Sequence, residues 1–304
     1  MSKSIIIQTK NLTKFYGKSR GIKNLDLEIH QGEVFGLLGP NGAGKTTTVR
    51  IFLDLIRKTS GEAQVFDLDV HHHSKEIRQR TAYLPGDLGL FQDKTARRNL
   101  QYLLGLYENH IPNRRIEELA VIFGLDLDRK VKELSKGNKQ KVGIVLALAP
   151  KLDLLILDEP TSGLDPLITA EFYKILQQQQ KKTGSTVLLS SHLLGEVEKV
   201  AHRVGIIREG TLVEVATLQQ PKSMAMKEIK VEFATKEALQ KFSNQLPSQI
   251  VESVILNETH ASFMIIREQI SNVFNLLSKF EILDVDVTSP ALEDLFLKYY
   301  EVIS

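Results

Sequence analysis

The sequence contains no cysteine among its 304 residues. Without cysteine the chain has no disulfide bonds, no thiolate metal sites and no cysteine nucleophile. This composition is compatible with a reducing compartment, so the cytoplasm is the default expectation. Apolar residues make up 42% of the chain, which is enough to fill a sizeable core at this length.

The sequence also lacks a long uninterrupted apolar segment. Its longest apolar tract, "VGIVLALAPKLDLLILDEP", is broken by Pro150, Lys151 and Asp153, whereas a membrane-spanning helix needs about 20 predominantly apolar residues. The N-terminal "MSKSIIIQTK" offers a run of three isoleucines and no cleavage site of small residues, unlike a secretory signal. We therefore expect that the chain does not cross a bilayer alone.

Charge of one sign is not in excess. The 39 lysine and arginine residues nearly balance the 37 aspartate and glutamate residues, and the formal charge is +2. Such a balance produces no strong long-range field toward nucleic acid or anionic lipid. We expect no nucleic-acid partner.

Three apolar segments rich in valine, leucine and isoleucine predict strands that are buried on both faces. They are "EVFGLLG" (33–39), "LDLLILDE" (152–159) and "STVLLSSH" (185–192). Near-continuous apolar strands separated by helical stretches are typical of a parallel α/β sheet. Between the first two strands, apolar residues recur every three to four positions over about 95–149, which predicts a helical insert.

The pattern changes after about Pro221. Strands and helices are predicted in the order strand, helix, strand, strand, helix, strand, followed by a last helix over 291–300. This order suggests a small ferredoxin-like α+β accessory domain. The sequence therefore predicts a first domain over 1–220 and an accessory domain over 221–304.

The segment "GPNGAGKT", Gly39 to Thr46, follows a predicted strand and opens a helix. It matches the phosphate-loop pattern G-x-x-x-x-G-K-T, in which glycines allow positive φ and close backbone approach. Its N–H groups form a nest for anions, and the helix dipole favours phosphate. We expect Lys45 to reach the β- and γ-phosphates of a nucleotide and the Thr46 hydroxyl to ligate Mg²⁺. An ordinary tight turn is the alternative, and the flanking strand and helix argue against it.

Two carboxylates end the second strand, in "LLILDEP". Asp158 lies where a magnesium-holding carboxylate belongs, and Glu159 is placed to take a proton from an attacking water. Alone, such a pair is more often a helix cap or a salt-bridge partner. The phosphate loop in the same chain favours the catalytic interpretation.

A third segment, "LSKGNKQK" (134–141), begins a helix shortly before the second strand, with Ser135 as its N-cap and Gly137 in its first turn. The phosphate loop, the helical insert, "LSKGN", "LLILDEP", "SGLD" and "SSH" follow one another along the chain. This order resembles that of ABC-type ATP-binding subunits over about 5–218. The segments "GLLGPNGAGKTTT", "YLPGD" and "PALEDLFLKYY" resemble, more narrowly, subunits that power exporters of antibiotics, other drugs or lipids.

The resemblance implies a P-loop NTPase fold of the ABC type, with a mixed, mainly parallel sheet, that binds ATP and Mg²⁺. It implies that Tyr16 stacks on adenine and that His192 holds the γ-phosphate or orients the attacking water. Ser135 and Gly137 would contact the γ-phosphate bound by a second protomer, with Asp165 at the same interface. The nucleotide would also contact the phosphate loop and its continuation, which are Gly39, Pro40, Asn41, Gly42, Ala43, Gly44, Lys45, Thr46 and Thr47.

A homodimer and a separate transmembrane permease are the partners that the resemblance implies. Two ATP molecules held between two copies would close the dimer, and cleavage of the γ-phosphate would open it. The catalytic groups would be Lys45, Glu159 and His192. The subunit would lie in the cytoplasm, at the inner face of the cell membrane, held there by the permease.

Two segments depart from the family pattern. The signature "LSKGN" has Lys136 and Asn138 where the family more often has glycine and glutamine, and neither change argues against binding. Gly86 in "YLPGD" stands where the family has a glutamine that contacts Mg²⁺. Residues 84–87 fit a type II turn with glycine at the third position. Alternatively, Asp87 replaces the glutamine as a metal ligand, or it faces the membrane partner.

Two other functions fit the sequence. One is a soluble ABC-type ATPase that acts on ribosomes or DNA, but such proteins tend to carry two cassettes or a long coiled coil, and this chain has neither. The other is a nucleotide-gated regulatory module with weak hydrolysis, which the missing glutamine keeps open. A comparison of ATP turnover with ATP affinity separates this module from a transport ATPase.

Overall fold

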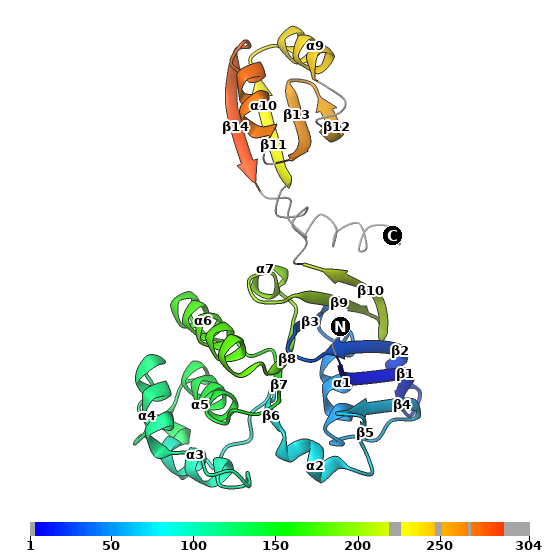
Figure 1. The fold of residues 1–304 in the computed structure, drawn as a ribbon. Helices are drawn as coiled ribbons and strands as arrows, with labels where there is room; N and C mark the ends of the chain where they lie inside the picture. The colour runs from blue at the N-terminus through cyan, green and yellow to red at the C-terminus, as the bar shows by residue number, and fades with distance from the viewer. Residues whose placement is uncertain (1–3, 219–225, 247–250, 267–268, 289–304) are drawn as a thin grey trace. The chain divides into compact units, whose positions relative to one another are not determined.

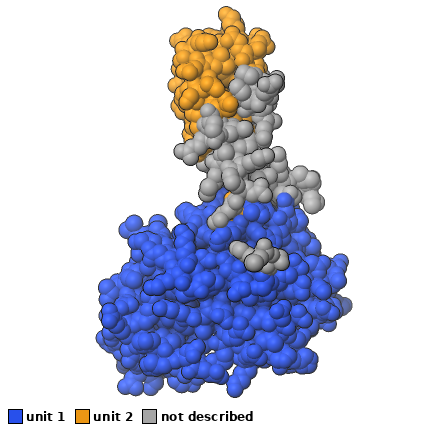
Figure 2. Space-filling model, in the orientation of Figure 1, with its two compact units in different colours: residues 1–217 blue, residues 218–304 orange. Residues whose placement is uncertain are grey.

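The computed structural model describes residues 4–218, 226–246, 251–266 and 269–288. The chain divides into two compact units, Met1–Thr217 and Leu218–Ser304, which Figure 2 colours separately. This division lies close to the change of pattern that the sequence shows after Pro221. The last helix predicted from the sequence, over 291–300, lies outside the described residues.

A six-stranded sheet lies at the centre of the first unit (Figure 1). Five strands run parallel in the order β9-β3-β8-β7-β6, and β10 pairs antiparallel with β9 at one edge. Every residue of β3, β7 and β8 is buried, which explains why these strands are continuous apolar runs in the sequence. The strands are β3 (Val34–Leu38), β6 (Thr81–Leu84), β7 (Leu154–Asp158), β8 (Thr186–Ser191), β9 (Arg203–Arg208) and β10 (Thr211–Thr217).

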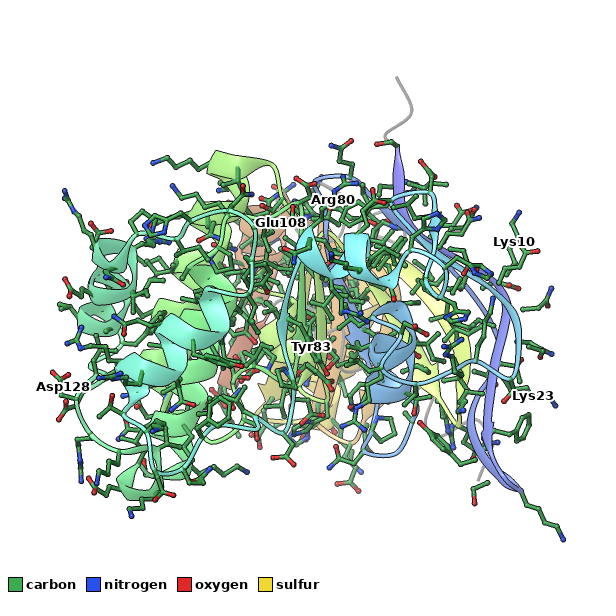
Figure 3. The ribbon with its side chains drawn as sticks, turned by 90° about the horizontal axis from the view of Figure 1, so that it is seen from below. Lys10, Lys23, Arg80, Tyr83, Glu108 and Asp128 are labelled. Atoms are coloured by element: carbon green, nitrogen blue, oxygen red, sulfur yellow. The ribbon has the colours of Figure 1, made fainter. Side chains whose placement is uncertain are left out.

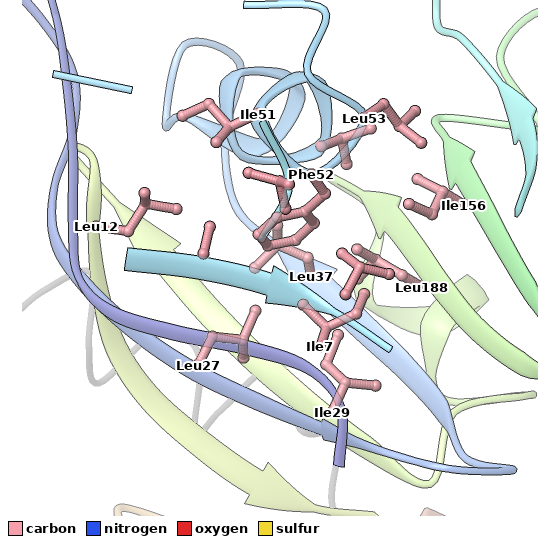
Figure 4. Close-up of a cluster of buried hydrophobic side chains, with 14 of the residues drawn as sticks. Ile7, Leu12, Leu27, Ile29, Leu37, Ile51, Phe52, Leu53, Ile156 and Leu188 are labelled. Atoms are coloured by element: carbon pink, nitrogen blue, oxygen red, sulfur yellow. The ribbon is translucent and has the colours of Figure 1, made fainter. Parts of the chain in front are cut away.

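A second, antiparallel sheet of the first unit has the strand order β2-β1-β4-β5. Its strands are β1 (Ile5–Tyr16), β2 (Ser19–His30), β4 (Ser60–Val65) and β5 (Leu68–Asp69). Helix α1 (Lys45–Phe52) packs its apolar side chains between this sheet and the central one. Figure 4 shows the resulting core, to which both sheets and the helix contribute, with Ile7, Leu12, Leu27, Ile29, Leu37, Ile51, Phe52, Leu53, Ile156 and Leu188.

The helical insert consists of α3 (Ala96–Leu104), α4 (Asn113–Ile122), the short 3₁₀ helix η1 (Val131–Glu133) and α5 (Lys136–Leu148). These helices lie together on one side of the central sheet (Figure 1). The side chain of Thr95 accepts a hydrogen bond from the N–H of Arg98 and so caps α3. The first of these helices begins at Ala96 and the last ends at Leu148. The remaining helices of this unit are α2 (Ser74–Gln79), α6 (Pro166–Thr183) and α7 (Leu194–Val197).

The second unit contains one antiparallel sheet with the strand order β12-β13-β11-β14. Its described elements follow one another as β11 (Met226–Phe233), α9 (Lys236–Gln245), β12 (Val251–Asn257), β13 (His260–Ile266), α10 (Ile270–Leu277) and β14 (Ile282–Thr288). Side chains of both helices and of the sheet form a core of its own, which includes Phe233, Phe242 and Phe263. Among the described residues of both units, no helix combines the length and the apolar composition of a membrane-spanning segment.

Candidate functional site

The strand order of the central sheet brings four sequence segments to one edge. The phosphate loop follows β3 at Gly39, His192 follows β8, Asp158 ends β7, and Gly86 comes shortly after β6. These four strands are consecutive neighbours and run parallel, so their carboxyl ends meet at the same edge. Segments from four distant parts of the sequence therefore form one site.

The phosphate loop adopts a backbone that only glycine allows at two positions. Gly42 has φ +81° and Gly44 has φ +109°, both in the left-handed region. A Cβ on Gly44 would also lie 2.8 Å from the carbonyl oxygen of Gly21. Helix α1 begins directly after Gly44. No described side chain accepts a hydrogen bond from the N–H groups at the start of this helix. Its first N–H groups are therefore available to an anion.

Lys45 is folded into the loop. Its ammonium group donates hydrogen bonds to the carbonyl oxygens of Gly39 (2.7 Å) and Pro40 (3.1 Å), and only 4% of the residue is exposed. The same Nζ lies 3.2 Å from Oε1 of Glu159, whose other oxygen, Oε2, lies 3.4 Å from Nδ1 of His192. The structure thus brings together the three side chains that the sequence analysis names as catalytic.

Glu159 holds this position with an unusual backbone. Its φ of +49° lies in the left-handed region, which a residue with a side chain rarely adopts. The N–H of Glu159 donates to the carbonyl oxygen (3.2 Å) and to the hydroxyl oxygen (3.1 Å) of Ser190. These bonds from the neighbouring strand hold the turn that aims the Glu159 carboxylate at Lys45 and His192.

Asp158 is fully buried and presents its two oxygens to different surroundings. Oδ1 accepts a hydrogen bond of 2.5 Å from the Ser190 hydroxyl, whereas Oδ2 is buried with no hydrogen-bond partner among the described residues. Burial, together with the negative charge of Asp158, raises the pKa of Tyr83. A buried carboxylate oxygen without a partner is costly unless a cation binds it. A carboxylate oxygen is a hard ligand of the kind that Mg²⁺ prefers, and Thr46 lies in the first turn of α1.

Gly86 lies beside this free oxygen. A Cβ added to Gly86 would lie 3.6 Å from Oδ2 of Asp158, an ordinary contact distance. The φ of Gly86 is outside the left-handed region, so the predicted type II turn is wrong, because such a turn needs positive φ at its third residue. The chain instead bends at Gly86 and Asp87, and the Asp87 side chain is exposed.

Tyr16 lies next to the start of α1. Its hydroxyl is 3.5 Å from the Thr47 hydroxyl, and 47% of the residue is exposed. The ammonium group of Lys14 lies 5.1 Å from the centre of the ring. The ring is therefore held near the phosphate loop and keeps an accessible surface.

Ser135, Gly137 and Asp165 form a separate group at two helix starts. The Ser135 hydroxyl accepts from the N–H of Asn138 (3.3 Å), which confirms it as the N-cap of α5. Asp165 caps α6 by accepting from two backbone N–H groups (3.0 and 3.1 Å). A Cβ on Gly137 would lie 2.8 Å from the carbonyl oxygen of Gly163, so the two helix starts approach closely. In the described part of the chain, no hydrogen bond or ion pair joins the three predicted residues to Lys45 or His192.

The comparisons with known proteins agree with this geometry. Residues 22–162 match the family model described as ABC transporter. The chain is 34% identical to the bacitracin transport ATP-binding protein BcrA of Bacillus licheniformis, over 97% of each chain. It belongs to the ABC transporter family.

Two further comparisons extend this result. This ABC family member is 33% identical to the linearmycin resistance ATP-binding protein LnrL of Bacillus subtilis (strain 168), over 70% of this chain and 69% of that protein. A solved structure titled "Structure of ATP binding subunit of ABC transporter" superimposes with a TM-score of 0.65 at 28% identity, over 70% of this chain and 90% of the other. The predicted fold class is confirmed, and so is the prediction of an ABC-type ATPase.

Two residues of this ATP-binding subunit support the site without being predicted. Ser190 contacts both Asp158 and Glu159, as described above. Gln140 is 7% exposed, and its side-chain N–H donates to the carbonyl oxygen of Pro160 (2.8 Å), which ties α5 to the loop after β7. The sequence carries a signal for Ser190, a polar residue at the end of an apolar strand, but none for Gln140, which lies between Lys139 and Lys141.

Proposed function

We propose that this chain is the ATP-hydrolysing subunit of an exporter that moves an antibiotic, another drug or a lipid-like molecule through a separate transmembrane permease. The observation that carries the proposal is the arrangement of Glu159 between Lys45 and His192, next to the free oxygen of Asp158. The names of the relatives, which refer to bacitracin transport and linearmycin resistance, support the export of an antibiotic.

We assign the nucleotide contacts to the phosphate loop and its surroundings. The N–H groups of the loop and the start of α1 bind the phosphates, and Lys45 turns from its carbonyl partners toward the β- and γ-phosphates. The exposed face of Tyr16 stacks on adenine. Thr46 and Oδ2 of Asp158 hold Mg²⁺, with Asp87 contributing through water. When bound, the ion neutralises charge that develops on the phosphates.

Hydrolysis then falls to two residues. Glu159 accepts the proton of the attacking water, because its carboxylate is the acidic group next to Lys45 at the end of β7. His192 contacts the γ-phosphate or orients the water from the opposite side of Glu159. The left-handed backbone of Glu159 fixes the direction of the carboxylate before the nucleotide arrives.

The remaining predicted residues need a second copy of the chain. Ser135, Gly137 and Asp165 lie at helix starts, and the N-terminus of a helix is suited to contact an anion. We propose that they contact ATP bound to the other protomer of a homodimer. ATP then closes the dimer, and cleavage of the γ-phosphate opens it.

A groove beside Gly86 provides a place for the permease. It has a volume of about 420 Å³ and lies between the central sheet, α1 and the insert, with a lining that includes Leu53, Tyr83, Leu88, Leu103, Leu106 and Leu146. Tyr83 is seen between α1 and the insert in Figure 3. Its apolar lining suits an apolar cytoplasmic segment of the permease, which would hold this chain at the inner face of the membrane.

The test of this proposal is turnover by the purified chain together with its permease. In Glu159→Gln the carboxylate is replaced by an amide that cannot accept the proton, so we expect turnover to fall by about 100-fold or more while ATP affinity stays the same. Glu62→Gln makes the same change at an exposed residue of β4 and should leave turnover unchanged. Unchanged activity in Glu159→Gln would contradict the proposal.

One observation favours a second function, a nucleotide-gated module with weak hydrolysis. Gly86 brings no side chain to Asp158, although the space would admit one. Such a module would bind ATP tightly and close, yet turn over slowly in the presence of its permease. Measuring both affinity and turnover of the unmodified chain separates the two functions.

A further inference from the structure

Glu196 is a carboxylate close to the site that the proposed mechanism does not use. It lies in α7, which begins two residues after His192. One of its oxygens, Oε2, accepts two hydrogen bonds, from the Thr161 hydroxyl (2.6 Å) and from the Tyr173 hydroxyl (2.9 Å). Tyr173 is 4% exposed, and Thr161 and Glu196 are partly buried, so the network is partly shielded from water.

The two donors lie on either side of Asp165 in the sequence. Thr161 lies in the loop between Glu159 and Asp165, and Tyr173 lies in α6, the helix that Asp165 caps. A single oxygen of Glu196 therefore joins three pieces of chain: the helix after His192, the loop after Glu159, and α6. Burial and the negative charge of Glu196 raise the pKa of Tyr173, so its hydroxyl remains a donor.

The network lines the same cavity as two of the catalytic groups. This cavity of about 750 Å³ is lined by Glu159 and His192 and also by Thr161, Tyr173 and Glu196. Because α7 begins two residues after His192, we expect a change in the position of His192 to shift the start of α7. The hydrogen bonds to the Glu196 carboxylate are charge-assisted and partly shielded from water, so they resist being broken.

We propose that Glu196 is a positioning residue that couples His192 to the loop of Asp165, so that both move together when ATP binds. This inference rests on the proposed function, in which His192 contacts the γ-phosphate and Asp165 contacts a second protomer. Glu196 itself contacts neither. Its effect is exerted through Thr161 and Tyr173.

The first readout is turnover. In Glu196→Ala both hydroxyls lose their acceptor, and we expect kcat to fall by about 10-fold to 100-fold while the Kd for ATP changes little. Glu196→Gln keeps an oxygen acceptor and should retain most of the activity. Gln177→Ala is the matched control, because Gln177 of α6 donates to the carbonyl oxygen of Lys199 (2.7 Å) and so ties α6 to the segment after α7 without reaching the loop. Equal losses in Glu196→Ala and Gln177→Ala would overturn the proposal.

The second readout does not depend on turnover. Amide hydrogen exchange is measured with and without ATP and Mg²⁺ in segments 161–165 and 192–197 of the full chain. We expect ATP to slow exchange in both segments of the unmodified chain, and only in 192–197 of Glu196→Ala. Joint protection that persists in Glu196→Ala would overturn the coupling.

Two milder variants serve if Glu196→Ala does not fold. Thr161→Val and Tyr173→Phe each remove one donor to Glu196 and should each weaken the joint protection of the two segments. Protection at the level of the unmodified chain in both variants would overturn the coupling. Wild-type turnover in Glu159→Gln would contradict the proposed function instead, and the exchange result would still decide the role of Glu196.

Discussion

At the scale of single residues, the site depends on carboxylates whose two oxygens have different tasks. Oδ1 of Asp158 is fixed by Ser190, whereas Oδ2 has no hydrogen-bond partner within the described ranges of the chain. Glu159 likewise offers one oxygen to Lys45 and the other to His192. A carboxylate fixed through one oxygen loses little further freedom when the other binds a ligand, and this applies to Asp158 in the proposed site.

The role of Asp87 is the residue-scale prediction. If Asp87 holds Mg²⁺ through water, Asp87→Ala should raise the Mg²⁺ concentration for half-maximal turnover by about 10-fold, or weaken coupled transport. Asp93→Ala removes another exposed carboxylate, paired with Lys132, and serves as the control in the Mg²⁺ titration. Wild-type Mg²⁺ dependence and wild-type transport in Asp87→Ala would show that the residue is only part of a bend.

Residue types were easier to predict from the sequence than their contacts. Lys45 could be named as a candidate from the phosphate-loop pattern, and Asp158 and Glu159 from their position at a strand end in the same chain. Their arrangement could not be predicted, because a left-handed φ at a residue other than glycine has no mark in the sequence, as Glu159 shows. The type II turn fitted to residues 84–87 was wrong for a different reason, because Pro-Gly permits such a turn but does not require it.

At the scale of elements, α5 connects the signature segment to the loop after β7. Ser135 is its N-cap and Gly137 lies in its first turn, and one turn further the side chain of Gln140 donates to the carbonyl oxygen of Pro160. A movement of α5 is therefore transmitted to Pro160, the residue after Glu159. The second half of α5, from Val142 to Leu148, is almost entirely buried and anchors the helix, whereas its first turn is more exposed.

Gln140 gives the element-scale prediction. In Gln140→Leu the carbonyl oxygen of Pro160 loses a buried donor, so we expect the free energy of unfolding to fall by about 1 to 3 kcal/mol. Denaturant-induced unfolding measures this change. Gln178→Leu makes the same substitution at an exposed position of α6 and is the control. Equal stability of the two variants would show that the bond to Pro160 contributes nothing.

The elements themselves were predicted unevenly. The buried parallel strands and the helical insert are evident from apolar runs and from helical spacing. The sheet that contains β1 and β2 was not predicted, because its long strands shift register near Asn11 and Asn24, whose φ values are +48° and +46°. Such bulges interrupt the alternation by which a half-buried strand is recognised.

At the scale of the whole molecule, the chain consists of two units with separate cores. The residues assigned to ATP, Mg²⁺ and the permease groove all belong to Met1–Thr217. The core of the second unit is built from its own sheet and helices, with several phenylalanine rings in contact. The first unit therefore contains everything that the proposed chemistry requires.

A chain that ends at Leu218 tests this division. We expect it to fold and to bind ATP as tightly as the full chain, because no site residue and no core side chain of the first unit is removed. A nucleotide titration measures the affinity, and sedimentation with ATP measures dimerisation. Loss of binding would contradict the prediction. Loss of dimerisation alone would assign dimer contacts to the second unit.

The neighbouring order of β3, β8, β7 and β6 has a consequence for redesign. Adjacent strands lie about 4.8 Å apart, and backbone hydrogen bonds set this interval. The phosphate loop, His192, Asp158 and Gly86 are therefore spaced by the sheet and not by their own side chains. A new side chain at any of these four strand ends would enter a frame of fixed dimensions. Gly86, with ordinary contact distances around an added Cβ, is the position at which this frame accepts a new metal ligand with the least rearrangement.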